Sequence, residues 1–272
     1  AYPADQASKI SELVKASQQA GVNFVWAIHP GKDIKWNKTD SANVLRKFEM
    51  MYELGVRHFA VFFDDISGEG TSAKGQAGLL NYIDNEFVKP KGDVGPLVMC
   101  PTDYNKSWGN YSEGHYMWTL GRTLNPSVEI MWTGDHVIDQ VTNKTLDFIN
   151  PIMARKAYIW WNFPVSDYVR DHLLMGPVYG NDCDVQDKLS GFVSNPMEHA
   201  DASMVTLGPI GDYCWNMAAY DSLASWRHCI RELMPTNSWA LEVFCKHNSD
   251  LGPNGHGFRR DESVGLKPVF DR

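Results

Sequence analysis

Short apolar runs recur along the chain at nearly regular intervals. They occupy residues 24–28, 59–63, 97–100, 128–132, 157–161 and 191–193. Successive runs begin 35, 38, 31, 29 and 34 residues apart. Near-continuous apolar runs of this length and spacing are typical of parallel strands that are buried on both faces. We therefore expect six parallel strands.

The segments between these runs show helical periodicity, because apolar residues three and four positions apart share one face of a helix. The first stripe consists of Ile10, Leu13 and Val14. The second consists of Leu45, Phe48, Met51, Tyr52 and Leu54, and the third of Leu79, Leu80, Ile83 and Phe87. Strand and helix thus alternate, which predicts the α/β class.

Polar residues follow each apolar run directly. In chain order they are His29-Pro30-Gly31, Asp64-Asp65, Pro101-Thr102-Asp103-Tyr104, Thr133-Gly134-Asp135, Asn162-Phe163-Pro164 and Ser194-Asn195-Pro196. In a (β/α)8 barrel the C-terminal strand ends open onto one face, where active sites lie. An open doubly wound sheet would place them along a crevice instead. No G-x-G-x-x-G or P-loop follows any run, which weakens a nucleotide-binding interpretation.

The six runs are two short of the eight strands of a barrel, and the helix expected near residues 5–20 has no strand before it. We therefore expect two strands and one helix upstream of this chain. After about residue 218 the pattern is purely helical, with Leu223, Trp226, Ile230 and Leu233 in one stripe. The prediction is a partial TIM barrel as catalytic domain over residues 1–218 and the start of a helical domain over residues 219–272.

Composition narrows the choice of partners. The chain has 272 residues, of which 43% are hydrophobic, and this is enough for one barrel of roughly 250 residues. Its formal net charge of −8 argues against a nucleic-acid partner, because phosphate binding needs a basic face. No apolar run approaches the roughly 20 residues of a membrane span. The five cysteines form no CxxC, so we interpret them as mostly free thiols.

Asp64 and Asp65 are adjacent carboxylates at the end of the most apolar run. Like charges so close raise one pKa, which suits a general acid at neutral pH. A helix N-cap or half of a cation site is the structural alternative. We favour catalysis because the pair stands at an expected barrel strand end.

Neighbours on one strand do not easily straddle a scissile bond, as the carboxylates of most glycosidases do at roughly 5 Å or more. They can instead serve a substrate-assisted route, in which the 2-acetamido oxygen of the sugar attacks the anomeric carbon.

With these residues the chain resembles glycoside hydrolase family 84, the O-GlcNAcases and related β-N-acetylglucosaminidases, and most of all its bacterial members. The likeness runs in order over about residues 22–203. The segments that carry it are WAIHPG at 26–31, FFDDI at 62–66, CPTDY at 100–104, WTGD at 132–135, WWNFPVSDY at 160–168 and SNPME at 194–198.

The resemblance implies a retaining exo-β-N-acetylglucosaminidase of the protein O-GlcNAcase type. Asp64 would orient the acetamido group, Asp65 would be the general acid and then base, and Tyr104 would hydrogen-bond near the reacting group. The residues implied to wall the N-acetyl pocket are Cys100, Thr133, Val137 and Trp160. Those implied to bind sugar hydroxyls are Asn162, Asp167 and Asn195. Taken singly, several have plain structural explanations, such as a turn at Asn195 or a helix cap at Asp167.

The family's Gly-Phe-Tyr-Gly type motif and a lysine, both in its first two strands, do not occur here, as expected if those strands lie upstream. The implied partner is a β-GlcNAc-bearing glycoprotein or glycan. Two alternatives stay open: a hydrolase of longer N-acetylated glycans such as hyaluronan, and a non-catalytic GlcNAc-binding module. The intact Asp64-Asp65 pair argues against the second. The oligomeric state is left open.

We expect no cofactor and no catalytic metal, because the sequence has no HxH or HExxH motif and no clear cluster of His with carboxylates. His29 is therefore interpreted as a structural histidine at a strand end, and His136 has no assigned role. The bacterial likeness predicts a periplasmic or secreted location. No signal peptide is visible, but the chain opens at Ala1 without Met, and a signal could precede it.

Overall fold

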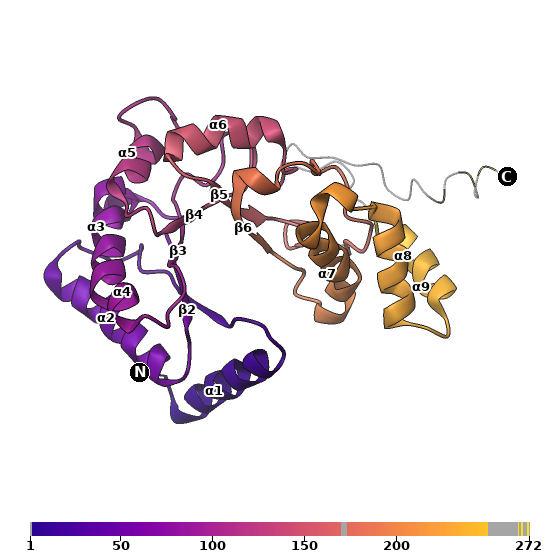
Figure 1. Cartoon of the computed structure of the whole chain (residues 1–272), viewed down its shortest axis with the longest axis horizontal. Coiled ribbons are helices and arrows are strands. Elements are labelled where there is room, and N and C mark those ends of the chain that lie inside the picture. The colour runs from indigo at the N-terminus through magenta and orange to yellow at the C-terminus, as the bar shows by residue number, and fades with distance from the viewer. Residues whose placement is uncertain (1, 170–172, 250–265, 267, 269–270, 272) are drawn as a thin grey trace. The chain divides into compact units, whose positions relative to one another are not determined.

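The computed structural model describes residues 2–169, 173–249, 266, 268 and 271. Its contacts divide the chain into two compact units. Unit 1 comprises Ala1–Tyr104, Trp108–Met131 and Asn150–Arg155, and unit 2 comprises Asn105–Ser107, Trp132–Ile149 and Lys156–Arg272. Figure 1 labels the helices and strands of both.

Unit 1 is built on parallel strands that pair in chain order. The strands are β1 (Val25–Ile28), β2 (His58–Phe62), β3 (Val98–Cys100) and β4 (Glu129–Trp132), the last of which ends in unit 2. The pairs include Ala27 with Ala60, Phe62 with Cys100 and Met99 with Ile130. The helices are α1 (Ala4–Gln19), α2 (Lys38–Glu53), α3 (Ala73–Ile83), α4 (Lys89–Lys91) and α5 (Tyr116–Thr123), with a 3-10 helix at Gly68–Thr71 and a π-helical turn at Asp84–Val88.

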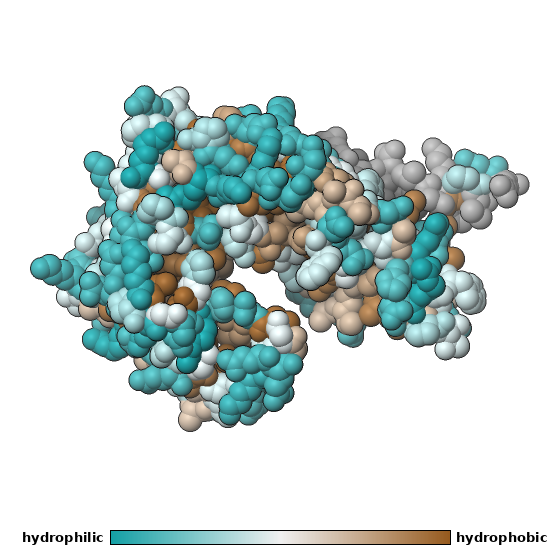
Figure 2. Space-filling view, viewed as in Figure 1, coloured by the Kyte–Doolittle hydropathy of each residue, from teal (hydrophilic) through white to brown (hydrophobic). Residues whose placement is uncertain are grey.

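Unit 2 pairs β5 (Ala157–Trp161) with β6 (Leu189–Ser194), again in parallel. Its helices are α7 (Ala200–Trp215), α8 (Ser222–Leu233) and α9 (Ser238–His247), with 3-10 turns at Gln186–Lys188 and Met217–Ala219. Helix α6 (Asn143–Met153) contributes residues to both units. In Figure 2 polar residues predominate on the outward face of α2, whereas apolar residues show on α7, where Met204 and Leu207 are exposed.

Alternation along β2 explains how its end comes to carry polar chemistry. Successive side chains of a strand point to opposite faces. Phe59, Val61 and Phe63 are fully buried, and Phe59 stacks on Phe48 of α2 at 4.9 Å between ring centroids. Period two puts Ala60, Phe62 and then Asp64 on the other face. The same aromatic packing that fixes the strand therefore fixes where Asp64 emerges.

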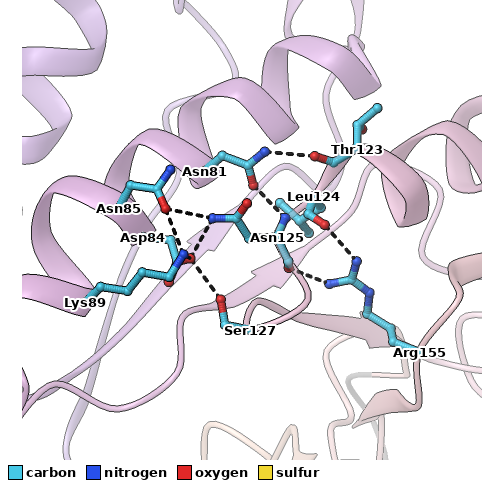
Figure 3. Close-up of polar contacts among 9 residues, drawn as sticks. All are labelled: Asn81, Asp84, Asn85, Lys89, Thr123, Leu124, Asn125, Ser127 and Arg155. Atoms are coloured by element: carbon cyan, nitrogen blue, oxygen red, sulfur yellow. Dashed lines mark hydrogen bonds and ion pairs between the residues drawn. The ribbon is translucent and has the colours of Figure 1, made fainter.

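A polar network fills the opposite, amino-terminal end of these strands (Figure 3). At its centre the carboxylate of Asp84, 1% exposed, accepts hydrogen bonds from Asn125 at 2.7 Å and Ser127 at 2.8 Å and pairs with Lys89 at 2.8 Å. The Arg155 guanidinium donates to five carbonyl oxygens at 2.6–3.3 Å: those of Gly121, Leu124, Asn125, Val128 and Met153. A cation at this position supplies hydrogen bonds to the carbonyl groups at the C-terminal end of α5. Its positive charge also interacts favourably with the negative end of the helix dipole.

The predicted α/β class is confirmed, and the parallel strands in chain order are those of a partial (β/α)8 barrel. The predicted domain boundary at residue 218 stays a prediction. Most of the predicted helical domain beyond Ser249 lies outside the described residues. In the part of the chain that the structure describes, no helix is both long and apolar enough to span a membrane.

Candidate active site

The turn that follows β2 holds Asp64 and Asp65 in different environments. Asp65 has a φ of 51°, in the left-handed region, and is exposed. For a residue with a Cβ, such a backbone costs about 1–3 kcal/mol and persists only where the surroundings impose it. Strain of this kind gathers at ligand and catalytic sites.

Asp64 is the more enclosed of the two carboxylates, with 23% of its side chain exposed. Its Oδ1 is buried and accepts no hydrogen bond from any described residue. The Nε2 atom of His29 lies 2.8 Å from the Asp64 carbonyl oxygen and 3.7 Å from Oδ1. Burial raises the pKa of Asp64, and the nearby His29 only partly opposes this. The backbone N–H of Asp64 and the Cys100 thiol also oppose the rise in the pKa of this carboxyl group, so the acceptor that lacks a donor is its Oδ1 atom.

Tyr104 and Cys100 join this pair from the end of β3. The Tyr104 hydroxyl donates to Oδ1 of Asp65 at 2.9 Å, and the tyrosine is 2% exposed. Burial and the Asp65 bond raise the pKa of Tyr104, so its hydroxyl keeps its proton. Burial and the two aspartates also raise the pKa of Cys100 well above its usual value, so Cys100 is a neutral thiol.

The carboxylates border a hollow of about 340 Å³ lined by His29, Lys32, Asp64 and Asp65. Glycines let the loops after β1 and β2 meet beside it. A Cβ on Gly70 would lie 2.1 Å from the Gly31 carbonyl oxygen, and a Cβ on Gly31 would lie 2.7 Å from Ile66. Position 70 therefore accepts only glycine without a shift of the backbone, whereas a side chain at position 31 would displace the end of the Ile66 side chain.

In unit 2 three of the implied sugar-contacting residues form a chain of hydrogen bonds. The Asn162 side chain, 5% exposed, donates from Nδ2 to the Val137 carbonyl at 2.7 Å. Its Oδ1 accepts from Nδ2 of Asn195 at 3.0 Å. The backbone N–H of Asn195 donates to the Trp161 carbonyl at 2.9 Å. The loops after β4, β5 and β6 are thereby tied together through these amides.

Three other implied residues lie in unit 2: Thr133, Trp160 and Asp167. Thr133 is 1% exposed and its hydroxyl donates to the His136 carbonyl at 2.9 Å. Trp160 is half-buried on β5, and Asp167 is exposed. Of the ten implied site residues, Asp64, Asp65, Cys100 and Tyr104 thus cluster within unit 1. Val137, Asn162 and Asn195 cluster within unit 2. Their roles stay predictions.

Residues 1–246 match the family model of the β-N-acetylglucosaminidases. The chain belongs to the β-N-acetylglucosaminidase family. The resemblance to glycoside hydrolase family 84 is confirmed, and the relatives are O-GlcNAcase glycoside hydrolases. The match includes the β2 end with Asp64 and Asp65, the β3 end with Tyr104 and the Asn162–Asn195 chain.

Members of this family with known structures are close in fold. The solved structure of CpGH84B has a TM-score of 0.91 and 33% identity, covering 99% of this chain and 48% of that chain. A mutant of the Thermobaculum terrenum O-GlcNAc hydrolase has a TM-score of 0.86 and 26% identity, covering 99% of this chain and 59% of that chain. Protein O-GlcNAcase of Mus musculus is 28% identical over 215 residues, which are 76% of this chain and 24% of that protein. This chain therefore spans about a quarter of its curated relatives and about half of the solved ones.

Sequence reasoning undervalued one residue of this candidate site and assigned no role to three others. His29, interpreted as structural, does bind a backbone carbonyl, but it also lies beside the Asp64 carboxylate. The other three, Gln76, Thr102 and Tyr116, are joined to one another by hydrogen bonds, and two of them bond to the carbonyls of Phe63 and Gly70 on either side of the pair. Gln76 carried a usable signal, because it stands three and four positions before Leu79 and Leu80 and so interrupts an apolar stripe with an amide.

Among the described residues, no group of three or more His, Cys, Asp or Glu side chains is arranged to hold a metal ion. The predicted absence of a catalytic metal stays a prediction.

Proposed function

We propose that the protein containing this chain is a retaining exo-β-N-acetylglucosaminidase of the protein O-GlcNAcase type. It removes terminal β-linked GlcNAc from a glycoprotein or glycan by substrate-assisted catalysis. The observation that carries the proposal is the buried, unpartnered Oδ1 of Asp64 directly beside Asp65. A buried acceptor without a donor is costly unless a ligand supplies one, and the acetamido N–H of GlcNAc is such a donor.

In this mechanism Asp64 accepts the acetamido N–H and turns the acetamido oxygen toward the anomeric carbon. That oxygen attacks C1 while the bond to the leaving oxygen breaks, and the amide proton passes to Asp64, which gives a neutral cyclic oxazoline. Asp64 returns this proton to the nitrogen when water opens the ring. The new hydrogen bond also favours the charged carboxylate, and so it opposes the effect of burial that raises the pKa of Asp64 in the free protein.

Asp65 acts on the leaving group. Tyr104 engages its Oδ1, which leaves the other carboxyl oxygen to carry the proton that the leaving oxygen takes up. Asp65 then removes a proton from the water that opens the oxazoline, so the product keeps the β configuration. Two inversions at C1, by the acetamido oxygen and then by water, account for retention without a covalent bond between sugar and enzyme.

Leaving-group dependence tests these two roles in the full-length protein. Asp65→Ala should lower kcat most for aryl β-N-acetylglucosaminides with poor leaving groups, because those need protonation. Asp64→Ala should slow even activated substrates. Asp5→Ala, an exposed carboxylate in the first turn of α1, is the control and should change neither.

Equal losses for all leaving groups in both variants would contradict the assignment. The absence of any hydrolysis by the wild-type protein would favour the non-catalytic GlcNAc-binding alternative, and release of internal units from hyaluronan would favour the glycan-depolymerase alternative. The periplasmic or secreted location stays a prediction beside this proposal.

A further inference from the structure

Gln76 is an amide on the buried face of α3, and none of its side chain is exposed. Its Nε2 donates to the Gly70 carbonyl at 2.8 Å and to the Thr102 hydroxyl at 2.9 Å. Its Oε1 accepts a hydrogen bond from the Tyr116 hydroxyl. Both donor hydrogens and the acceptor are therefore in use, as a buried amide requires.

The partners of Gln76 carry this connection to two loops. The Thr102 hydroxyl donates onward to the Phe63 carbonyl at 3.0 Å, and the Thr102 N–H donates to the Tyr116 oxygen at 2.8 Å. Phe63 and Gly70 flank the segment that holds Asp64 and Asp65. Thr102 lies midway between Cys100 and Tyr104. One side chain thus ties both ends of the carboxylate loop to the loop that carries Tyr104.

The carboxylate loop has reason to need such a tie. Asp65 keeps a left-handed backbone, which an L-residue leaves unless its neighbours prevent it. The Tyr104 bond to Asp65 bridges the two loops and lengthens if either of them shifts. A displacement of about 1 Å in a reacting group can cost on the order of 10²-fold in rate.

We propose that Gln76, acting with Thr102 and Tyr116, is a positioning residue that fixes the Asp64-Asp65 turn against Tyr104. The inference rests on the proposed function, because it assigns what holds the proposed catalytic pair. Gln76 itself touches neither carboxylate in any hydrogen bond of the structure. Its effect on turnover is carried through Phe63, Gly70 and Thr102.

The amide is chemically specific for this position, since the site needs donors toward Gly70 and Thr102 and an acceptor toward Tyr116. Leucine supplies neither. An ionised glutamate supplies no donor and sets a negative charge against the Gly70 carbonyl, whereas a protonated glutamate regains one donor and the acceptor. Gln76→Glu should therefore improve relative to wild type as the pH falls, and Gln76→Leu should not.

Asn81→Ala provides a matched control on the same helix. Asn81 donates to the Thr123 carbonyl at 2.8 Å and accepts from the Asn125 N–H at 2.7 Å, both at the other end of α3 (Figure 3). This substitution also removes two hydrogen bonds of an α3 side chain, one exposed and one half-buried, at the end of the helix away from Asp64 and Asp65. Thermal unfolding of all variants, followed in the full-length protein, shows that each is folded at the assay temperature.

The test measures kcat and KM for an aryl β-N-acetylglucosaminide over a range of pH. We expect Gln76→Leu to lower kcat by about 10²-fold with little change in KM, and Asn81→Ala to keep the wild-type kcat. The ratio of Gln76→Glu to wild-type kcat should rise as the pH falls. If Gln76→Leu keeps the wild-type kcat, or loses no more than Asn81→Ala, the inference is wrong.

Amide hydrogen exchange gives a readout that does not depend on turnover. Exchange at residues 64–67 and 102–104 should be faster in Gln76→Leu than in wild type or Asn81→Ala. Wild-type protein that hydrolyses no substrate would overturn the proposed function alone, since faster exchange would still support the positioning of the loop. Unchanged exchange in Gln76→Leu would overturn the inference whether or not the protein is an enzyme.

Discussion

Two aspartates of unit 1, at opposite ends of the same strands, behave in opposite ways. Asp84 is almost fully buried, yet its pKa lies below the ordinary value, because Lys89, Asn125 and Ser127 outweigh the effect of burial. Asp64 is less buried, yet burial raises its pKa. The partners of each carboxylate therefore decide the direction in which its pKa shifts.

The surroundings of Asp84 and Asp64 also differ in how fully their polar groups are hydrogen-bonded. Around Asp84 the polar groups have hydrogen-bond partners, and Arg155 alone donates to five carbonyl oxygens. Around Asp64 an oxygen lacks a donor and the next residue has a left-handed backbone. In barrels the amino-terminal face serves stability and the carboxyl-terminal face serves chemistry, and this chain divides its polar residues accordingly.

The largest expected effect is on rate and concerns Asp64. Asp64→Asn should lower kcat/KM by about 10²–10³-fold, because the amide no longer offers a charged acceptor to the developing oxazoline. Tm should not fall, since the substitution removes a buried charge that has no hydrogen bond on Oδ1. Steady-state kinetics and thermal unfolding of the same preparation check both parts. A Tm loss as large as that of an Asp84 variant would break the contrast.

The next effect is on stability and concerns Asp84. Asp84→Asn should lower the free energy of unfolding by about 2–4 kcal/mol, because Lys89 and two hydrogen-bond donors lose a charged partner. The kcat of the folded enzyme should stay near the wild-type value. Denaturant unfolding measures the change. Asp147→Asn, which removes an exposed ion pair with Lys188, is the control and should cost less than about 1 kcal/mol.

The smallest effect is a difference of sign in the pH dependence of stability. The lowered pKa of Asp84 means that its contribution is complete above about pH 4, the unfolded value, and is lost as the pH falls further. The raised pKa of Asp64 means that the folded state holds this proton more tightly, so wild type loses stability as the pH rises from about 4.

Unfolding of both Asn variants across this pH range separates the two signs. The stability gap between wild type and Asp84→Asn should shrink as the pH falls below about 4, and Asp64→Asn should gain on wild type as the pH rises above it. Parallel curves for the two variants would show that both carboxylates have the same kind of surroundings.

The sequence predicted the strands well because short apolar runs at this spacing seldom form anything other than buried strands. All six strands begin and end within two residues of the runs that predicted them. Burial at the edge of the sheet was harder to predict. Val25 is 50% exposed on β1, although an apolar run suggested burial on both faces. Leu13 is 55% exposed in α1, because periodicity names a helix face but not the element that covers it.

The site was predictable as far as side chains follow strand ends. Alternation along β2 and its register with β3, in which Phe62 pairs with Cys100, bring Asp64 close to Cys100. Asp64 was named from its position after a strand, whereas Cys100 was named only because the family resemblance implied it. The left-handed backbone of Asp65 was not predictable, because aspartate adopts this conformation more often than most residues but is a much weaker signal for it than glycine. The support from Gln76 and Tyr116 depends on how α3 and α5 pack onto the strands, which local patterns do not specify.

Fluorination of the substrate's acetyl group tests the central claim most directly, namely that Asp64 serves an acetamido nucleophile. Fluorine withdraws charge from the acetamido oxygen and makes it a weaker nucleophile. The account predicts that kcat/KM of the full-length protein falls progressively from acetyl through mono- and difluoroacetyl to trifluoroacetyl substrates. A flat response, or a sugar trapped covalently on Asp103, Asp135 or Asp167, would contradict it.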